Sequence, residues 1–212
     1  NNLITKEQGL DPVIDWIAIF GELYYQEFSK QAYFMKLADG GTSLAVDGAD
    51  WDWNASSVDE LADLSINKMT KSLSQIRPNK TPVYVSKLTG NDSTGNGTGS
   101  NPYLTEAKAL SVSTPDNVVL VINFWEFHQG EADASNSTDS LAWNSNCNDL
   151  RDKIRTNYNV PCILSTIHPD IDKVNAVNVY NAQFDLSGNI YTYPNMTAGT
   201  GDVNTFTCVL ND

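Results

Sequence analysis

The apolar run from Val118 to Trp125 constrains the fold more than any other feature of the chain, because only Asn123 interrupts it. A run of this length predicts a β-strand that is covered on both faces, as in parallel sheets. A dense group of polar residues follows it directly, at the strand's carboxyl end, where α/β proteins hold their ligands. The run therefore predicts an α/β fold and marks the first place to look for a functional site.

Short apolar segments alternate with amphipathic segments along most of the chain, which is the pattern of a parallel α/β domain. The spacing of apolar residues predicts helices over 20–30, 58–76, 139–158 and 174–184, and strands over 32–37, 118–125, 160–167, 189–193 and 205–210. Right-handed crossovers would place the loops that follow the strands along one edge. We therefore expect a three-layer α/β/α sandwich with a mainly parallel sheet.

Size and charge limit the partners of this chain. Its 212 residues fit one compact domain, 1–212, with a sizeable core. The formal net charge of −13 argues against nucleic acid and against an anionic membrane surface, and no apolar run approaches the ~20 residues of a membrane helix. A neutral glycan or a small ester suits this charge better. Three widely spaced cysteines, Cys147, Cys162 and Cys208, are predicted to be buried free thiols.

Residues 77–117 break the alternation with a composition rich in Gly, Ser, Thr and Asn, most strongly over 89–102. Such a composition predicts a surface loop or insertion rather than a core element. The sequence Val83-Tyr-Val-Ser-Lys-Leu-Thr-Gly-Asn-Asp and its continuation to Thr105 resemble the opening of pectin-lyase-like β-helix domains. Those domains are common in phage tailspikes and in secreted proteins that act on polysaccharides, but this stretch is too short to stack into a β-helix.

The segment after the apolar run, Trp125-Glu-Phe-His-Gln-Gly-Glu-Ala-Asp-Ala134, gathers His128, Gln129, Glu131 and Asp133 around one glycine. A carboxylate there could orient a histidine, and an amide could donate to a developing oxyanion. Acidic residues at this place could equally cap the start of a helix and meet its dipole. The residue types alone leave both interpretations open.

Two sequence blocks resemble a known family. The block Phe127-His-Gln-Gly-Glu-Ala-Asp133 resembles the His-Gln-Gly-Glu block of the sialate O-acetylesterase-like SGNH hydrolases, which include carbohydrate esterase family six. Upstream, Phe34-Met-Lys-Leu-Ala-Asp-Gly-Gly-Thr-Ser-Leu44, followed by Trp51, resembles the family's Gly-Gly-Thr block and trailing tryptophan. The resemblance covers most of the chain outside 77–117. It implies an SGNH or flavodoxin-like sandwich that hydrolyses acetyl esters on sugars through a serine nucleophile.

The resemblance also implies roles for individual residues. The backbone amide of Gly41 and the side chain of Gln129 would bind the oxyanion, and Glu131 would orient the catalytic histidine. Asp212 would begin the family's Asp-x-x-His block. Thr42 and His128 would contact the substrate, which gives the set Gly41, Thr42, His128, Gln129, Glu131 and Asp212. No cofactor and no metal are implied.

The chain departs from the family at its ends. It holds no Gly-Gln-Ser or Gly-Asp-Ser block, and Asp212 is its last residue. We interpret this as truncation at both ends, with the nucleophile and the catalytic histidine in flanking sequence. A site of Ser43 with His168 as its base is an alternative, against which Ser43 and Thr42 could simply form hydrogen bonds within their turn. The two histidines, forty residues apart, provide no metal-ligand spacing.

The sequence thus predicts a carbohydrate O-acetylesterase that acts on an acetylated polysaccharide or glycan outside the cell or on a virion. It would form a homo-oligomer, a trimer if it belongs to a tail fibre. The alternative is a non-catalytic structural or glycan-binding module of a phage tail fibre or cell-surface protein. The esterase hypothesis requires that the turn at Gly40 and Gly41 and the segment around Gln129 lie side by side at one rim of the sheet.

Overall fold

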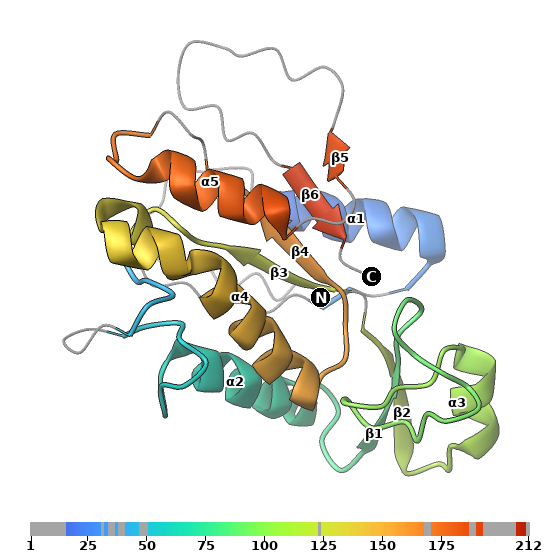
Figure 1. Cartoon of the computed structure of the whole chain (residues 1–212). Coiled ribbons are helices and arrows are strands. Elements are labelled where there is room, and N and C mark those ends of the chain that lie inside the picture. The colour runs from blue at the N-terminus through green and yellow to red at the C-terminus, as the bar shows by residue number, and fades with distance from the viewer. Residues whose placement is uncertain are drawn as a thin grey trace, which may run out of the picture. The chain divides into compact units, whose positions relative to one another are not determined.

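The computed structural model describes residues 16–30, 32–33, 37, 41–46, 51–122, 124–167, 171–186, 190–192 and 207–210. The chain divides into two compact units, residues 1–36 and residues 37–212. Helix α1 (Trp16–Phe28) belongs to the first unit, and all the other elements belong to the second (Figure 1). Of the strand predicted over 32–37, residues 34–36 lie outside the described residues, and residues 32, 33 and 37 are not in a strand.

The second unit is mixed α/β. Its elements are α2 (Leu61–Ile76), β1 (Thr81–Val85), α3 (Glu106–Val112), β2 (Asn117–Val121), β3 (Trp125–His128), a 3-10 helix η1 (Asp133–Ser135), α4 (Ser137–Asn157), β4 (Cys162–Ser165), α5 (Ala176–Asp185), β5 (Ile190–Thr192) and β6 (Thr207–Leu210). The four predicted helices and the strands predicted over 160–167, 189–193 and 205–210 are confirmed, with ends shifted by a few residues.

The strands form two small sheets. In the first, β1 and β2 pair in parallel, with Val85 opposite Val121. The second has the order β3-β4-β6-β5, in which β3 and β4 are parallel, with His128 opposite Ser165, whereas β6 is antiparallel to both of its neighbours. Helix α4 supplies the crossover that the parallel pair β3 and β4 requires. The second sheet is therefore mixed. Its parallel pair is β3 and β4, and the polar block follows β3.

The prediction of one strand over 118–125 is wrong. Strand β2 ends at Val121, and the chain then changes sheets, so that β3 begins at Trp125. The amide of Ile122 donates to the carbonyl oxygen of Val85 at 2.8 Å, and that of Trp125 donates to the carbonyl oxygen of Pro161 at 2.8 Å. Both halves of the run are apolar, so the sequence pattern does not indicate where the chain stops pairing with β1 and begins to pair with β4.

Residues 77–117 are not a surface loop throughout. Strand β1, helix α3 and strand β2 enclose a small core of Val85, Tyr103 and Ala109. Between β1 and α3 the chain does form the predicted loop, which the Asp92 carboxylate closes by accepting from the amide of Thr105 at 3.0 Å and from its hydroxyl at 2.7 Å. The polar composition of this stretch concealed the short apolar strand at its start.

The main core lies under α4. The predicted stripe of Trp143, Cys147, Leu150 and Ile154 is buried on this helix, and it packs in one cluster that also includes Leu44, Trp53, Leu61, Phe127, Leu164 and Val179. In Figure 1, α4 lies between α2 and α5, and it contacts both. Cys147 and Cys162 are buried free thiols, as predicted, whereas the side chain of Cys208 lies outside the described residues.

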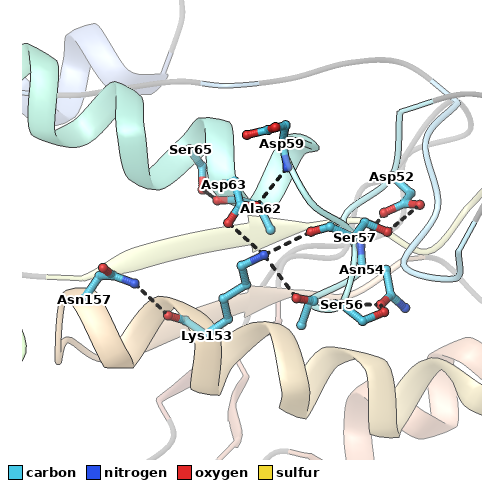
Figure 2. A network of polar contacts seen from close by, with 11 residues as sticks. Asp52, Asn54, Ser56, Ser57, Asp59, Ala62, Asp63, Ser65, Lys153 and Asn157 are labelled. Carbon is cyan, nitrogen blue, oxygen red and sulfur yellow. Dashed lines mark hydrogen bonds and ion pairs between the residues drawn. The ribbon is translucent and has the colours of Figure 1, made fainter.

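Lys153 ties α4 to α2 and to the loop that precedes α2 (Figure 2). Its Nζ lies 2.7 Å from Asp63 Oδ1 and donates to the carbonyl oxygens of Ala55 at 3.0 Å and Ser57 at 3.2 Å. The hydrogen bond from Lys153 holds the pKa of Asp63 below its ordinary value. One largely buried ammonium group thus satisfies three acceptors from two segments. The ion pair of Lys153 and Asp63 should therefore contribute more to stability than an exposed ion pair does.

We expect Lys153→Met to lower the free energy of unfolding by about 2 kcal/mol, because it leaves Asp63 and two carbonyl oxygens without their donor. Chemical denaturation measures this change. Lys87→Met is the matched control, because Lys87 forms a longer and more exposed pair with Glu106 and should cost much less. Equal losses in the two variants would contradict the assignment.

The same pair makes stability depend on pH. Because the folded-state pKa of Asp63 lies below its ordinary value of 3.8, the pair stabilises the fold above that pH and loses this stabilisation as the pH falls. Acid should therefore reduce the difference in stability between the wild type and Lys153→Met.

Candidate functional site

The two sequence blocks meet at the carboxyl end of β3. Gln129 Nε2 donates to the carbonyl oxygen of Thr42 at 2.7 Å. The carboxylate of Asp133 accepts from the amide of Leu44 at 3.1 Å and from the amide of Ala45 at 3.2 Å. These contacts join segments that are 87 to 89 residues apart in the sequence. The predicted contact between the two blocks is therefore confirmed.

Asp133 is the centre of this contact. Its side chain has no exposure to solvent, and it also accepts from Gln129 Nε2 at 2.6 Å. Burial raises the pKa of the Asp133 carboxyl, whereas the hydrogen bonds from Gln129 and from the amides of Leu44 and Ala45 act in the opposite direction. A carboxylate that accepts from several N–H groups of both segments acts as a clamp between them.

The side chain of Gln129 points into the protein, where it is 6% exposed. Its Nε2 donates to Thr42 and to Asp133, and its Oε1 accepts from the indole N–H of Trp143 at 3.1 Å. An amide nitrogen has two hydrogens, so both are engaged. The oxyanion role that the resemblance implies for Gln129 would require it to release one of these bonds.

Helix α5 fixes the same turn from the other side. Gln183, which is fully buried, donates from Nε2 to the carbonyl oxygen of Gln129 at 2.8 Å and accepts at Oε1 from the amide of Ile167 at 2.8 Å. It thereby ties together the chain just after β3 and just after β4. Gly130 adopts φ 143°, and a Cβ there would lie 2.6 Å from Val179 Cγ1, so only glycine lets α5 approach this closely.

His128 and Glu131 lie on the exposed side of the block. His128 Nε2 is 3.0 Å from Glu131 Oε1, and the two side chains are 34% and 49% exposed. The hydrogen bond to Glu131 raises the pKa of His128, and the same bond lowers the pKa of Glu131. The resemblance implies that Glu131 orients a catalytic histidine. In this structure, however, the histidine that Glu131 contacts is His128, which belongs to the same block.

Gly41 and Thr42 lie at the rim of the upstream block. Gly41 is exposed with φ 82°, and a Cβ there would have no neighbour within 4 Å. Thr42 Oγ1 accepts from the indole N–H of Trp53 at 3.1 Å. Ser43 Oγ donates to the carbonyl oxygen of Ala45 at 2.9 Å, which confirms the expected hydrogen bond within the turn. Asp212 and His168 lie outside the described residues.

Sequence reasoning assigned no role to Trp53 and Gln183, and it named Asp133 only as one of the polar residues of its block. Trp53, rather than the exposed Trp51, is buried against the upstream block, while Asp133 and Gln183 hold the turn. Gln183 had a sequence signal, since it is a polar residue next to Val179 and Ala182 on the buried face of α5. A polar side chain at such a core position must find hydrogen-bond partners there.

Comparisons with protein-family models, with curated proteins and with solved structures find no match for this chain. Within the described ranges, no group of three or more His, Cys, Asp and Glu side chains could hold a metal ion. No helix in the described part of the chain has both the length and the apolar character needed to cross a membrane. The interpretation of the site therefore depends on its geometry and on the resemblance of its two blocks.

We expect Asp133→Asn to lower the free energy of unfolding by about 2–3 kcal/mol, because an amide group replaces one of the two acceptor oxygens and leaves buried N–H donors unpaired. Hydrogen exchange should accelerate at the amides of Leu44 and Ala45. Asp149→Asn on the exposed side of α4 is the control. Unchanged exchange at Leu44 and Ala45 would show that Asp133 is not the clamp.

We expect Glu131→Gln to lower the pKa of His128, because the neutral amide no longer favours the charged imidazole while the partial burial of His128 still opposes it. An NMR titration of the imidazole protons measures this shift. The pair stabilises the fold between the lowered pKa of Glu131 and the raised pKa of His128, and it loses this contribution as the pH rises through the pKa of His128 or falls through that of Glu131. Glu106→Gln on α3 should leave the titration as it is, and a similar shift in both variants would refute the pairing.

Proposed function

We propose that this chain is part of a carbohydrate O-acetylesterase related to the sialate O-acetylesterase-like SGNH hydrolases, with residues 1–212 forming one three-layer α/β/α domain. The observation that carries the proposal is the contact between the Gly-Gly-Thr block and the His-Gln-Gly-Glu block, through Gln129, Thr42 and the Asp133 clamp. Two distant segments that resemble one family's site blocks meet at the carboxyl end of a parallel strand pair, which is where α/β enzymes bind substrates.

The proposed reaction is the hydrolysis of an acetyl ester through an acyl-enzyme. A serine hydroxyl attacks the acetyl carbonyl, and a histidine takes its proton and passes it to the departing sugar oxygen. Water then attacks the acetyl-serine and releases acetate. The backbone amide of Gly41 stabilises the oxyanion, and the clamp below it keeps this turn in place. The nucleophile and the histidine come from residues outside the described ones.

The proposed substrate is an acetylated polysaccharide or glycan, which the net charge of −13 favours over polyanions. The proposed location is extracellular or on a virion, with a trimer if the chain belongs to a tail fibre. The β1-α3-β2 unit supports this setting, because its sequence resembles the opening of the β-helix domains of tailspikes and secreted polysaccharide-acting proteins.

One feature of the site favours a second candidate, a non-catalytic structural or glycan-binding module. The Gln129 amide is fully engaged inside the protein, and no hydrogen bond in the described part of the chain joins a serine to a histidine. Such a module would keep the rigid turn and the exposed rim but would release no acetate.

Acetate release by the full-length protein tests the proposal, with p-nitrophenyl acetate and acetylated oligosaccharides as substrates. We expect Gly41→Val to lower kcat by about 10²-fold, because a β-branched residue avoids positive φ and would displace the amide that binds the oxyanion. Gly41→Asn is the matched variant: asparagine tolerates this conformation, and a Cβ meets no neighbour there, so most activity should remain.

Equal activity in the wild type and both Gly41 variants would exclude this amide from the oxyanion site. If the wild-type protein binds acetylated glycan but releases no acetate, the esterase proposal fails and the second candidate is correct. Thermal melting of each variant separates a loss of folding from a loss of chemistry.

A further inference from the structure

We propose that a polar hollow beside Gly41 is a binding subsite for a neutral, hydroxyl-rich saccharide. The hollow has a volume of about 520 Å³, within the range of ~300–1,000 Å³ in which proteins bind small ligands. It is lined by Gly41, Ser43 and Val46 of the upstream block, by Ala132, Ser135 and Asn136, by Asp139 in the first turn of α4, and by Lys173. The inference rests on the proposed function, since it places the sugar next to the amide that would bind the oxyanion of its acetyl group.

Two opposite charges line the hollow without pairing. Asp139 and Lys173 have no ion pair and no side-chain hydrogen bond among the described residues, so they stand farther apart than the 4.0 Å of an ion pair. A carboxylate accepts hydrogen bonds from hydroxyl groups, and an ammonium donates to hydroxyl oxygens. Because their charges cancel, the pair favours a neutral ligand that presents several hydroxyl groups over an ion.

The uncharged lining residues add donors and acceptors to the hollow. Asn136 Oδ1 already accepts from the amides of Thr138 at 2.8 Å and Asp139 at 3.4 Å, which leaves its Nδ2 as a donor. Ser43 donates its hydroxyl hydrogen to Ala45, which leaves its oxygen as an acceptor. A sugar hydroxyl both donates and accepts, so a lining that offers donors and acceptors together suits a ring with several hydroxyl groups.

The charge of the whole chain selects between two kinds of saccharide. With a net charge of −13, the protein repels uronates and other anionic sugars at a distance. Within the hollow, the carboxylate of Asp139 cancels the attraction that the ammonium of Lys173 would exert on an anion. The geometry and the charge together point to a neutral oligosaccharide.

An NMR titration tests the subsite without relying on catalysis. The isotope-labelled full-length protein is titrated with neutral tetrasaccharides of xylose, glucose, mannose and galactose, and with trigalacturonate as the anionic comparison. We expect at least one neutral sugar to shift the amide signals of Ser43, Ser135, Asn136 and Asp139, with trigalacturonate weaker. Asp139→Asn should weaken the binding of that sugar by about 10-fold, because it removes a charged hydrogen-bond acceptor.

Asp149→Asn is the matched control, because it makes the same change on an exposed part of the same helix and should leave the affinity unchanged. Ser135→Trp should fill the hollow and abolish saturable binding while the melting temperature stays close to that of the wild type. The proposal is overturned if no neutral sugar shifts these signals, if the shifts map to another surface, or if trigalacturonate binds more tightly. It is also overturned if Asp139→Asn and Asp149→Asn bind equally well.

The acetate assay separates this inference from the proposed function. Acetate release without shifts at the hollow would overturn the subsite and leave the esterase in place. Binding at the hollow without acetate release would support the subsite and overturn the esterase.

Discussion

The buried carboxylate of Asp133 is the interaction on which the candidate site depends. Removing a carboxylate from water is costly unless N–H donors replace its hydration. Leu44, Ala45 and Gln129 supply those donors, and two of them come from a segment almost ninety residues earlier in the chain. If the upstream block left its place, the Asp133 carboxylate would lose the amides of Leu44 and Ala45 as hydrogen-bond donors while it remained buried. The block is therefore held in place by the cost of leaving this carboxylate without donors. This cost fixes the position of the Gly41 turn more firmly than apolar packing alone.

The clamp is itself held by the core. Trp143 on α4 donates to Gln129, and Gln183 on α5 joins the chain after β3 to the chain after β4. Each of these side chains is buried and takes its direction from a helix that packs in the main cluster. Lys153, also on α4, secures the loop that follows Trp53, and the indole of Trp53 donates to Thr42. Rigid elements thus support the turn from several directions, as sites that must hold a fixed geometry require.

The polar block divides into an inner and an outer set. Gln129 and Asp133 face inward and hold the turn, whereas His128 and Glu131 remain partly exposed beside it. Gly41 lies at the same rim and adjoins the polar hollow. In the function proposed above, the inner set would position the backbone, and the outer set and the hollow would contact the ligand. It accommodates an esterase and a glycan-binding module alike, because both need a rigid rim, and they differ only in whether a nucleophile is present.

The sequence by itself determined four of the helices, though not α3, as well as which face of α4 is buried and where along the chain the polar blocks lie. These features are local, since apolar spacing within one segment reveals the face that it buries. Only the tertiary structure decided that residues 118–125 serve two different sheets, and that the Gln129 amide turns inward rather than toward a ligand. A strand's pairing partner and the direction of a side chain at its end depend on groups from distant segments. Thr42, Leu44 and Trp143 are such groups for this site, and no local pattern around Gln129 indicates that they will be there.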